Sequence, residues 1–416
     1  MKVQCCIAGG GPAGMMLGLL LARAGVEVAV LEKHADFFRD FRGDTIHPST
    51  LDLMAELGLL EDFLRVPHDR VLQLSGVIGG VTIPIADFSH VPTRCKFLAL
   101  MPQWDFLNFL ADRAKRYACF HLLMQSQAVD LLHAEDRVCG VVALTPGGQQ
   151  RIEADLVVAS DGRGSVLRER AGLLRKQLGA PRDILWMRIS RRPSDPEQTF
   201  GMVAAGGIFI SLNRGTYWQC GYVIPKGAFE QIRTGGLLAF HESVARAAPF
   251  LADRVEELRT WDDVRLLTVA VDRLQKWYAP GLLCIGDAAH AMSPIGGVGV
   301  NLAIQDAVAA ANMIAQPLLR GTVTERELAA VQRRRMFPTR VTQRLQVVIQ
   351  NRVVRPILAR RDAVMKPPLL LQAFVHFPLL RRIPAWLVGV GVRPEHIHTP
   401  QAVAPAGAAA PASSRS

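Results

Sequence analysis

Three glycines near the N-terminus constrain the fold of this chain more than any other feature. An apolar run at residues 3–8 leads directly into Gly9-Gly10-Gly11-Pro12-Ala13-Gly14. In a Gly-x-Gly-x-x-Gly turn, the missing side chains let the backbone approach a pyrophosphate, and the N-terminus of the following helix favours the anion. The pattern predicts a strand, this turn and a helix from Met15 to Ala24. The cofactor contacts expected here are Gly9, Gly11, Pro12, Ala13 and Gly14.

The next segment fits a second strand of the same unit. Gly25 ends the helix, residues 26–31 are apolar except for Glu27, and Glu32 stands eighteen residues after Gly14. A carboxylate at about this spacing accepts a hydrogen bond from a ribose hydroxyl. Glu32 and the adjacent Lys33 are therefore candidate cofactor contacts, and the N-terminal part is predicted to be a Rossmann-like α/β unit.

A second glycine-rich segment, residues 281–301, narrows the choice of dinucleotide. Residues 281–287 are expected to form a buried strand that ends at Asp287, whose carboxylate can accept a hydrogen bond from a sugar or ribityl hydroxyl. Small residues after it leave room for a flat ring, and a helix expected over 301–315 turns its positive end toward that ring. A reduced flavin is an anion, so FAD is the predicted cofactor. The contacts expected in this segment are Gly286, Asp287, Pro294, Gly297, Val298, Gly299, Val300 and Asn301.

A third motif lies between these two, with Asp161-Gly162-Arg163-Gly164-Ser165 followed by Arg168. In their order and spacing, the three motifs resemble those of the single-component FAD-dependent aromatic monooxygenases, of the para-hydroxybenzoate hydroxylase and ubiquinone-biosynthesis hydroxylase type. The resemblance covers residues 2 to about 312. It implies an α/β protein in which a Rossmann-like FAD-binding domain carries an inserted antiparallel β-sheet substrate domain and C-terminal helices.

The resemblance also implies the reaction. Such an enzyme hydroxylates an aromatic or phenolic small molecule, with NADH or NADPH as reductant and O₂ as oxidant, through a flavin hydroperoxide. Because FAD occupies the single dinucleotide fingerprint, the nicotinamide would bind transiently elsewhere. Two other functions remain open. One is a flavin-dependent reductase of prenyl double bonds, and the other is a non-catalytic FAD-binding redox sensor.

Several site residues follow from matching positions in the family motifs. Arg42 corresponds to an arginine near the FAD pyrophosphate, Gln103 to a contact near the ribose, and Asp161 to the acidic residue of the third motif. Pro294 corresponds to a proline beside the flavin carbon that takes up oxygen, and is a catalytic candidate. Arg168 fits either a structural ion pair or a nicotinamide contact.

Two histidines and two tyrosines are weaker candidates. His47 precedes a helix close to the expected pocket, and its ordinary pKa suits proton transfer, so it is the second catalytic candidate. The alternative is a buried polar group of structural use only, which is the role expected for His290. Tyr217 and Tyr222 are candidate pocket phenols or core residues.

Composition divides the chain into segments of different character. Residues 1–70, 101–180 and 266–330 are assigned to the FAD-binding domain, and residues 71–100 and 181–265 to the substrate domain. Residues 331–400 form a C-terminal helical region, and the Ala/Pro/Ser-rich residues 401–416 a disordered tail. The seven cysteines show neither metal-ligand spacing nor a disulfide framework, so no metal site is expected. A cytoplasmic location is expected, because the glycine turn inside the N-terminal apolar run indicates a nucleotide fingerprint and not a signal peptide. No stretch long enough to span a membrane is free of charges or Gly/Pro breaks.

The net charge of +11 is concentrated near the C-terminus. Residues 320–393 hold fifteen Lys or Arg against three Asp or Glu, interspersed with apolar residues at helical spacing. A solvated helical cap on the flavin domain is one interpretation. The other is a peripheral membrane contact, which would place the protein at the inner face of the membrane. Nucleic acid binding is not expected, since no binding motif accompanies the charge. Assembly as a homodimer is compatible with the sequence.

Overall fold

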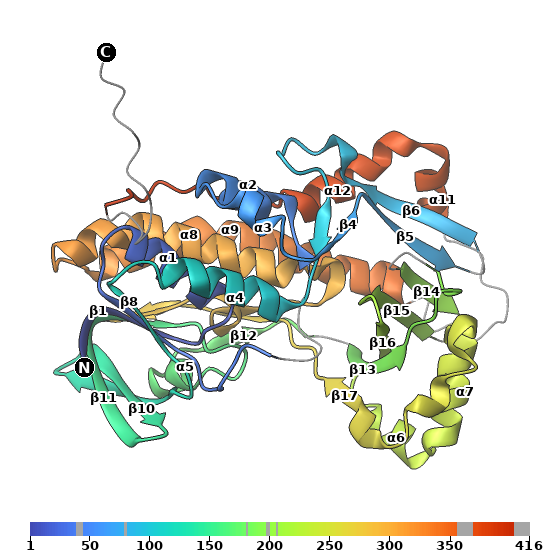
Figure 1. Ribbon diagram of the computed structural model, residues 1–416, viewed down its shortest axis with the longest axis horizontal. Coiled ribbons are helices and arrows are strands. Elements are labelled where there is room, and N and C mark those ends of the chain that lie inside the picture. The colour runs from blue at the N-terminus through green and yellow to red at the C-terminus, as the bar shows by residue number, and fades with distance from the viewer. Residues whose placement is uncertain are drawn as a thin grey trace.

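The apolar run at the N-terminus forms β1 (Lys2–Ala8), a central strand of a mainly parallel sheet in the computed structural model (Figure 1). On one side of β1 lie β2 (Val28–Leu31) and then β8 (Phe120–Leu123). On the other side lie β11 (Gly148–Ala159) and then β20 (Leu282–Cys284). All these neighbours are parallel. Both faces of the central strands are covered, which explains their almost uninterrupted apolar sequence.

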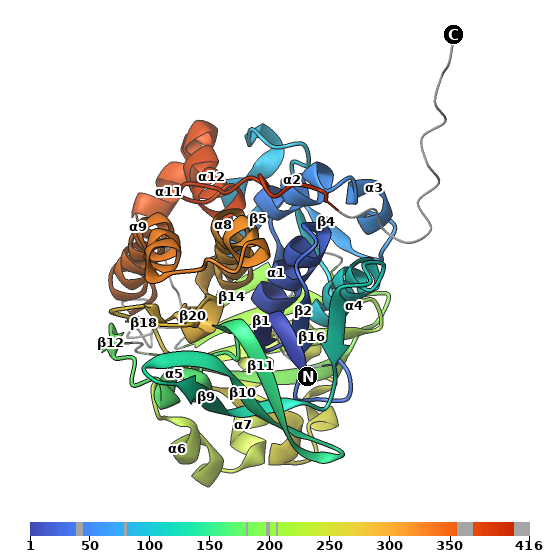
Figure 2. The same cartoon turned by 90° about the vertical axis from the view of Figure 1, so that its left-hand side faces the viewer.

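The structure describes residues 1–38, 45–78, 81–179, 182–196, 200–204, 207–355 and 369–402. Three helices cover one face of the parallel sheet and share one apolar core with it: α1 (Pro12–Arg23), α4 (Gln103–Ala114) and α8 (Val298–Leu319) (Figure 2). On the other face, β11 continues into an antiparallel meander with β10 (Arg137–Thr145) and β9 (Gln127–Ala134). The predicted turn at residues 145–148 is confirmed as the link between β10 and β11.

Two helices have other boundaries than those predicted from the sequence. The helix α1 begins at Pro12 rather than Met15, because proline suits the first helical position, where its missing N–H is not needed. The helix α8 starts at Val298 rather than Asn301, directly after Gly297, whose φ of +63° sets the backbone turn. It also continues four residues past Ala315, because Pro317 lies in the last turn and does not stop it.

A seven-stranded second sheet stands at the other end of the molecule (Figure 1). The two inserts predicted from the sequence, residues 71–100 and 181–265, contribute its opposite parts. The two parts meet where β14 pairs with β5, which is the only parallel pair among the described strands of this sheet. The predicted antiparallel pairing holds for the other pairs. In order, the strands are β17 (Val264–Leu267), β13 (Arg182–Ser190), β16 (Tyr217–Pro225), β15 (Gly207–Asn213), β14 (Phe200–Ala204), β5 (Gln73–Ile78) and β6 (Val81–Asp87).

One face of this sheet is packed and the other is left for a cavity. The helix α7 (Leu237–Ala247), preceded by α6 (Phe229–Thr234), packs on the first face through an apolar core that includes Phe240 and Phe209. Tyr222 contacts both of these rings, so it belongs to the core and not to the pocket. The domain limits drawn from the sequence stay a prediction.

Smaller elements connect the two sheets. The helices among them are α2 (Pro48–Glu56), α3 (Leu60–Phe63) and α5 (Val166–Arg170). One small sheet consists of β3 (Thr45–Ile46), β7 (Leu98–Leu100) and β4 (Asp69–Val71), and another of β12 (Arg175–Gln177), β18 (Asp272–Leu274) and β21 (His290–Ala291). The short strand β19 (Tyr278–Ala279) pairs with β20.

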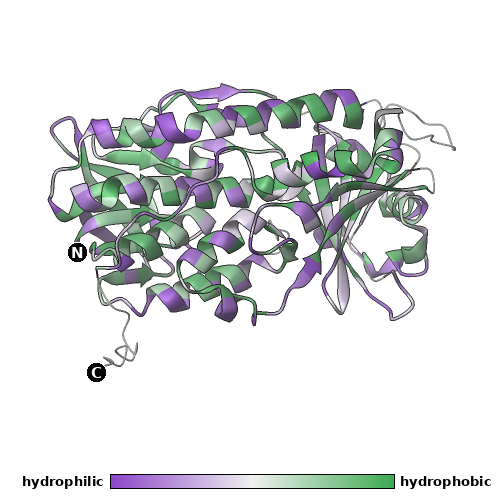
Figure 3. Ribbon diagram, turned by 90° about the horizontal axis from the view of Figure 1, so that it is seen from above, coloured by the Kyte–Doolittle hydropathy of each residue, from purple (hydrophilic) through white to green (hydrophobic). Residues whose placement is uncertain are grey.

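The described part of the C-terminal region is helical, as predicted, up to residue 389. The long helix α9 (Glu325–Ile349) lies along α8 and continues into the π-helical turn η7 (Gln350–Val354). Figure 3 shows hydrophilic and hydrophobic residues interspersed along the long helices. Further along the chain, α11 (Leu369–His376) and α12 (Arg382–Gly389) pack beside β6, and residues 390–402 return without helix or strand toward α1. The predicted disordered tail falls almost wholly on residues 403–416, outside the described residues.

One helical stretch in the described part of the chain, Ile295–Leu319, is long and apolar enough to cross a membrane by length and composition. However, 78% of its most apolar window is buried inside the protein. The stretch contains α8, which supplies much of the core against the parallel sheet. We therefore assign it as a core helix.

Candidate active site

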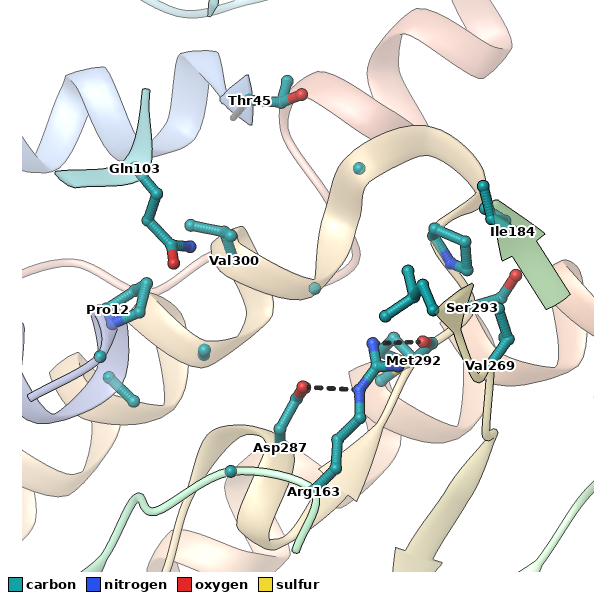
Figure 4. A pocket seen from close by; sticks show the side chains of 18 of the residues that line it. Pro12, Thr45, Gln103, Arg163, Ile184, Val269, Asp287, Met292, Ser293 and Val300 are labelled. Carbon is teal, nitrogen blue, oxygen red and sulfur yellow. Dashed lines mark hydrogen bonds and ion pairs between the residues drawn. The ribbon is translucent and has the colours of Figure 1, made fainter. Parts of the chain in front are cut away.

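A cavity of about 700 Å³ extends from the glycine turn after β1 to the open face of the second sheet (Figure 4). Its nucleotide end is lined by residues 8–13, by Glu32 and Lys33, and by Gln103 at the start of α4. The loops at residues 160–164 and 292–300 line its middle. Its far end is lined by apolar side chains of the sheet, including Ile184, Ile210 and Val269. One continuous space therefore joins a nucleotide site to an apolar chamber.

The glycine turn fits a bound pyrophosphate. A Cβ on Gly9 would lie 2.4 Å from the Ser160 carbonyl oxygen, and one on Gly14 would lie 2.0 Å from the Gly9 oxygen. These two glycines are thus required for the turn to pack against its neighbours. In contrast, a Cβ on Gly11 would meet nothing within 4 Å, because Gly11 faces the cavity. Open backbone at a helix N-terminus is the setting in which proteins bind phosphate.

Glu32 lies where the sequence placed it, at the end of β2. Its Oε2 accepts a hydrogen bond from the Gly10 N–H (3.2 Å), and its Oε1 accepts one from the His34 N–H (3.1 Å). These two contacts hold the carboxylate beside the glycine turn, on the wall of the cavity. Lys33 and Gln103 line the same end. Arg42 lies outside the described residues, so its pyrophosphate contact stays a prediction.

Asp287 forms an ion pair that the sequence did not indicate. Arg163 Nε donates to Asp287 Oδ2 (3.0 Å), while its Nη1 donates to the Thr268 carbonyl (3.4 Å) and its Nη2 to the Met292 carbonyl (3.5 Å) (Figure 4). Both partners line the cavity. The sequence contained one indication that Arg163 has a role, its place in the third motif. A motif does not show which residue pairs with it, and Asp287 lies 124 residues further along the chain.

The third motif also supplies a buried carboxyl with spare hydrogen-bonding capacity. Asp161 Oδ2 accepts a long hydrogen bond from the Leu167 N–H (3.4 Å), and no described residue bonds Oδ1. Burial raises the pKa of this carboxyl. Because Asp161 lines the cavity, a hydroxyl of the cofactor would satisfy the free oxygen. Glycine spacing and this carboxyl together show that the residues present fit FAD.

Arg168 has a structural position. Its side chain is 1% exposed and donates to the Ala288 carbonyl (3.0 Å) and to the Arg163 carbonyl (2.7 Å). These bonds tie the third motif to the loop after β20. Arg168 does not line the cavity, which favours the structural role over a nicotinamide contact, although its observed partners are carbonyls and not the acidic residue of an ion pair.

The loop that carries Pro294 requires glycine at two positions. Gly296 and Gly297 have φ values of +78° and +63°, which side-chain-bearing residues rarely adopt. A Cβ on Gly297 would also lie 2.9 Å from Thr45 Oγ1. Pro294, Gly297, Gly299 and Val300 all line the cavity, between the nucleotide end and the sheet. This position is compatible with the predicted catalytic role of Pro294, which stays a prediction.

Buried glutamines of α9 and η7 hold this loop, and sequence reasoning missed them. Gln346 accepts from the Ser293 N–H (3.1 Å) and donates to the Ser293 and Ile295 carbonyls (2.8 and 3.0 Å). Gln350 donates to Ser293 Oγ (3.1 Å), and Gln343 donates to the Ala291 carbonyl (3.1 Å). The only signal was their spacing of three and four residues, which resembles an ordinary polar face. We call these three residues the glutamine ladder.

Four predicted cofactor contacts lie outside the lining of the cavity: Gly14, Gly286, Val298 and Asn301. Asn301 Oδ1 accepts from Thr50 Oγ1 (2.8 Å) and from Ser49 Oγ (3.1 Å), so it joins α8 to α2. A Cβ on Gly286 would lie 3.3 Å from the side chains of Ala13 and Ala303. Their observed contacts are therefore structural.

His47 lies behind the same loop and does not line the cavity. It is fully buried, and its Nε2 lies 3.3 Å from the Gly296 carbonyl oxygen. Burial lowers the pKa of its ring to about 4, so the ring is neutral at physiological pH. The catalytic role stays a prediction, but the contact that the structure shows supports the loop.

His290 is structural, as expected. Its Nε2 lies 2.5 Å from Asp306 Oδ2 in the interior of α8, and the same oxygen accepts from the Gly286 N–H (3.1 Å). Arg335 of α9 donates to Asp306 Oδ1 (2.9 Å) and to Glu395 Oε1 (3.1 Å). Burial opposes the charge of Asp306, but His290 and Arg335 together lower its pKa. This network ties the loop after β20 to the C-terminal region.

The described residues contain no group of His, Cys, Asp and Glu that could hold a metal ion. All seven cysteines are free thiols, and five of them are buried.

Comparison with known proteins agrees with this geometry. The FAD binding domain family model matches residues 2–345. A 6-methylpretetramide 4-monooxygenase of Streptomyces rimosus is 32% identical over 369 residues, covering 87% of this chain and 86% of that protein. A digeranylgeranylglycerophospholipid reductase of Methanocella arvoryzae is 24% identical over 341 residues, covering 78% and 80%. Other related proteins are longer, and the chain spans 60% to 63% of five of them.

The fold agrees as well. The solved structure of the OxyS anhydrotetracycline hydroxylase from Streptomyces rimosus superposes with a TM-score of 0.72 at 23% identity, covering 94% of this chain and 76% of that chain. Because one cavity brings a flavin site and an organic ligand chamber together, the protein is a flavoprotein oxidoreductase that uses FAD. More narrowly, the chain belongs to the FAD-dependent aromatic monooxygenase family, which confirms the resemblance seen in its three motifs.

Proposed function

We propose that this monooxygenase hydroxylates a polycyclic aromatic phenol, with NADH or NADPH as reductant and O₂ as the oxygen source. The observation that carries the proposal is the apolar chamber of the cavity, which opens directly onto the loop of Pro294. Its wall of Ile184, Trp186, Ile210 and further apolar side chains matches a large flat ligand with an extensive apolar surface. The similarity to a 6-methylpretetramide monooxygenase supports the same class of substrate.

The chain would supply binding, orientation and a dry chamber. Gly9, Gly11 and the N-terminus of α1 would hold the pyrophosphate of FAD, and Glu32 its ribose. Asp161 and Asp287 would accept hydrogen bonds from further hydroxyls. The chemistry that FAD would supply when bound is the transfer of electrons from the nicotinamide to O₂ and of one oxygen atom to the substrate. The sheet wall would keep water from the reacting ring.

The test is a screen of polycyclic phenols for compounds that accelerate NAD(P)H oxidation by the purified holoenzyme. Products are then formed under ¹⁸O₂ and analysed by mass spectrometry. We expect a stimulating phenol whose product carries one ¹⁸O atom. NAD(P)H oxidation that yields only hydrogen peroxide with every phenol would contradict the proposal.

A second candidate is reduction of prenyl double bonds, which the similarity to a digeranylgeranylglycerophospholipid reductase favours. The higher identity and coverage of the monooxygenase relative favour hydroxylation. The two functions differ in the same assay, because a reductase adds hydrogen to its substrate and incorporates no ¹⁸O. A redox sensor would hold FAD and oxidise no NAD(P)H in response to any phenol.

For the C-terminal region we propose the helical cap rather than the membrane contact. Arg335 is buried against Asp306 and Glu395, and Arg334 Nε donates to Glu395 (2.8 Å), so part of the basic charge is used inside the protein. Seven free thiols are compatible with the cytoplasmic location expected from the sequence. Salt-reversible sedimentation of the holoenzyme with anionic vesicles would contradict the cap.

A further inference from the structure

The sheet wall of the cavity contains one charged side chain among the described residues, Arg182 at the start of β13. Successive side chains of a strand point to opposite faces of the sheet, so Arg182, Ile184 and Trp186 lie on the same face. All three line the cavity. The other charged lining residues belong to the nucleotide end and the loops around it: Glu32, Lys33, Asp161, Arg163 and Asp287. Arg182 is therefore a cation at the substrate end.

No described residue neutralises this cation. No carboxylate or carbonyl in the described part of the chain receives a hydrogen bond from Arg182, and its Nε is buried without a partner. The charged residue whose field acts on Arg182 is Arg355, a second cation. Burial and Arg355 both lower the pKa of Arg182. The Arg182 side chain is half-buried in the cavity wall, and a cation partly withdrawn from water interacts more strongly with a counter-ion than one on the surface. An anionic group of a ligand in this chamber would supply such a counter-ion.

Gln350 adds a complementary acceptor on the helical side of the cavity. The Gln350 side chain is 3% exposed, and its Nε2 donates a hydrogen bond to Ser293 Oγ (3.1 Å). Its Oε1 is buried, has no partner among the described residues, and belongs to a side chain that lines the cavity. An amide oxygen in this setting is satisfied by a hydroxyl or N–H of a ligand.

We infer that Arg182 receives an ionised oxygen of the aromatic substrate, a carboxylate or an acidic phenol, and that Gln350 accepts a hydrogen bond from a neighbouring donor group of the same ligand. This assignment rests on the proposed function, since it concerns the same chamber. A guanidinium suits such an oxygen because it donates two parallel hydrogen bonds. Substrates are thus selected by an acidic group as well as by a flat apolar body.

The test is equilibrium binding to the FAD-loaded enzyme, followed through the absorbance of the bound flavin. Two ligand pairs separate charge from shape: anthraquinone-2-carboxylate against anthraquinone-2-carboxamide, and ionised 2-hydroxyanthraquinone against 2-methoxyanthraquinone. The first pair tests a carboxylate and the second a phenolate. We expect the wild type to prefer the anion in at least one pair by about 10- to 100-fold, the range for hydrogen bonds to charged groups.

The variant Arg182→Gln should lose this preference while binding of the neutral ligand stays within about threefold, and Arg182→Lys should keep part of it. Arg188→Gln is the matched control, because it removes the same charge from an exposed position on β13 outside the cavity. If Arg182→Gln does not retain FAD, Arg182→Met serves the same comparison. Equal binding of anion and neutral ligand by the wild type overturns the assignment, as does a preference that survives in the variant.

This outcome is independent of turnover. An enzyme that incorporates no ¹⁸O can still show the anion preference, and an active hydroxylase can lack it. The two proposals therefore fail separately.

Discussion

Replacing Gln346 by leucine tests whether the glutamine ladder positions the flavin loop, by which we mean residues 286–297 between β20 and α8. The side chain is 3% exposed and makes three hydrogen bonds to the backbone of Ser293 and Ile295. Each bond contributes about 1 kcal/mol net, so Gln346→Leu should lower the free energy of unfolding by about 3 kcal/mol. Since the loop lines the cavity beside the predicted flavin ring, FAD should also bind more weakly and kcat should fall.

Three measurements check this prediction: denaturant unfolding of the holoenzyme, FAD titration of the apoprotein, and turnover with a stimulating phenol. Arg344→Leu is the control, because Arg344 lies on the same helix with its side chain exposed. We expect the control to behave like the wild type. A Gln346→Leu enzyme with wild-type stability and FAD affinity would refute the reasoning, since the ladder would then contribute nothing to the loop.

Four further outcomes are expected. Asp287→Ala should weaken FAD binding by about 10- to 100-fold in a fluorescence titration, because a charge-assisted hydrogen bond is lost. Gly297→Val should abolish turnover, whereas Gly299→Ala should be nearly neutral, since a Cβ there meets only Met292 at 3.8 Å. Arg335→Met should destabilise the protein by about 3–5 kcal/mol in denaturant unfolding, because Asp306 loses a buried partner. Folding lowers the pKa of His47 from 6.5 to about 4, so between these pH values the unfolded chain binds a proton that the folded protein does not. The free energy of unfolding of the wild type should therefore fall by up to about 3 kcal/mol as the pH is lowered from 6.5 to 4. In His47→Gln this fall should be smaller.

Local sequence was sufficient to predict the nucleotide end of the site. Gly9, Gly11 and Glu32 occupy the expected turn and strand end because their roles depend on residues next to them in the chain. The same holds for the turn between β10 and β11. Such features need no knowledge of distant partners.

Contacts between distant segments could not be predicted. Nothing in the spacing of Arg163 and Asp287 indicates that they pair, and nothing in the two inserts indicates that β14 and β5 run parallel. The arginines of α9 resemble a solvated face in sequence, yet Arg335 is 1% exposed. Burial of a charge is decided by the partners that the fold brings to it, here Asp306 and Glu395.

The helix α9 explains how the two flanks of the flavin loop are held by one element. On one flank, Arg335 secures Asp306, which in turn accepts the hydrogen bond of the Gly286 N–H. On the other flank, Gln346 binds Ser293 and Ile295. The backbone between these anchors includes Asp287 and Pro294, so its position depends on a helix outside all three motifs. The similarity to the family extends to residue 345, well past the last glycine of the loop, and so includes Arg335 and Gln343 of this helix. In this chain the loop that lines the flavin site is therefore held by α9, and a truncation after α8 would remove both Arg335 and Gln346.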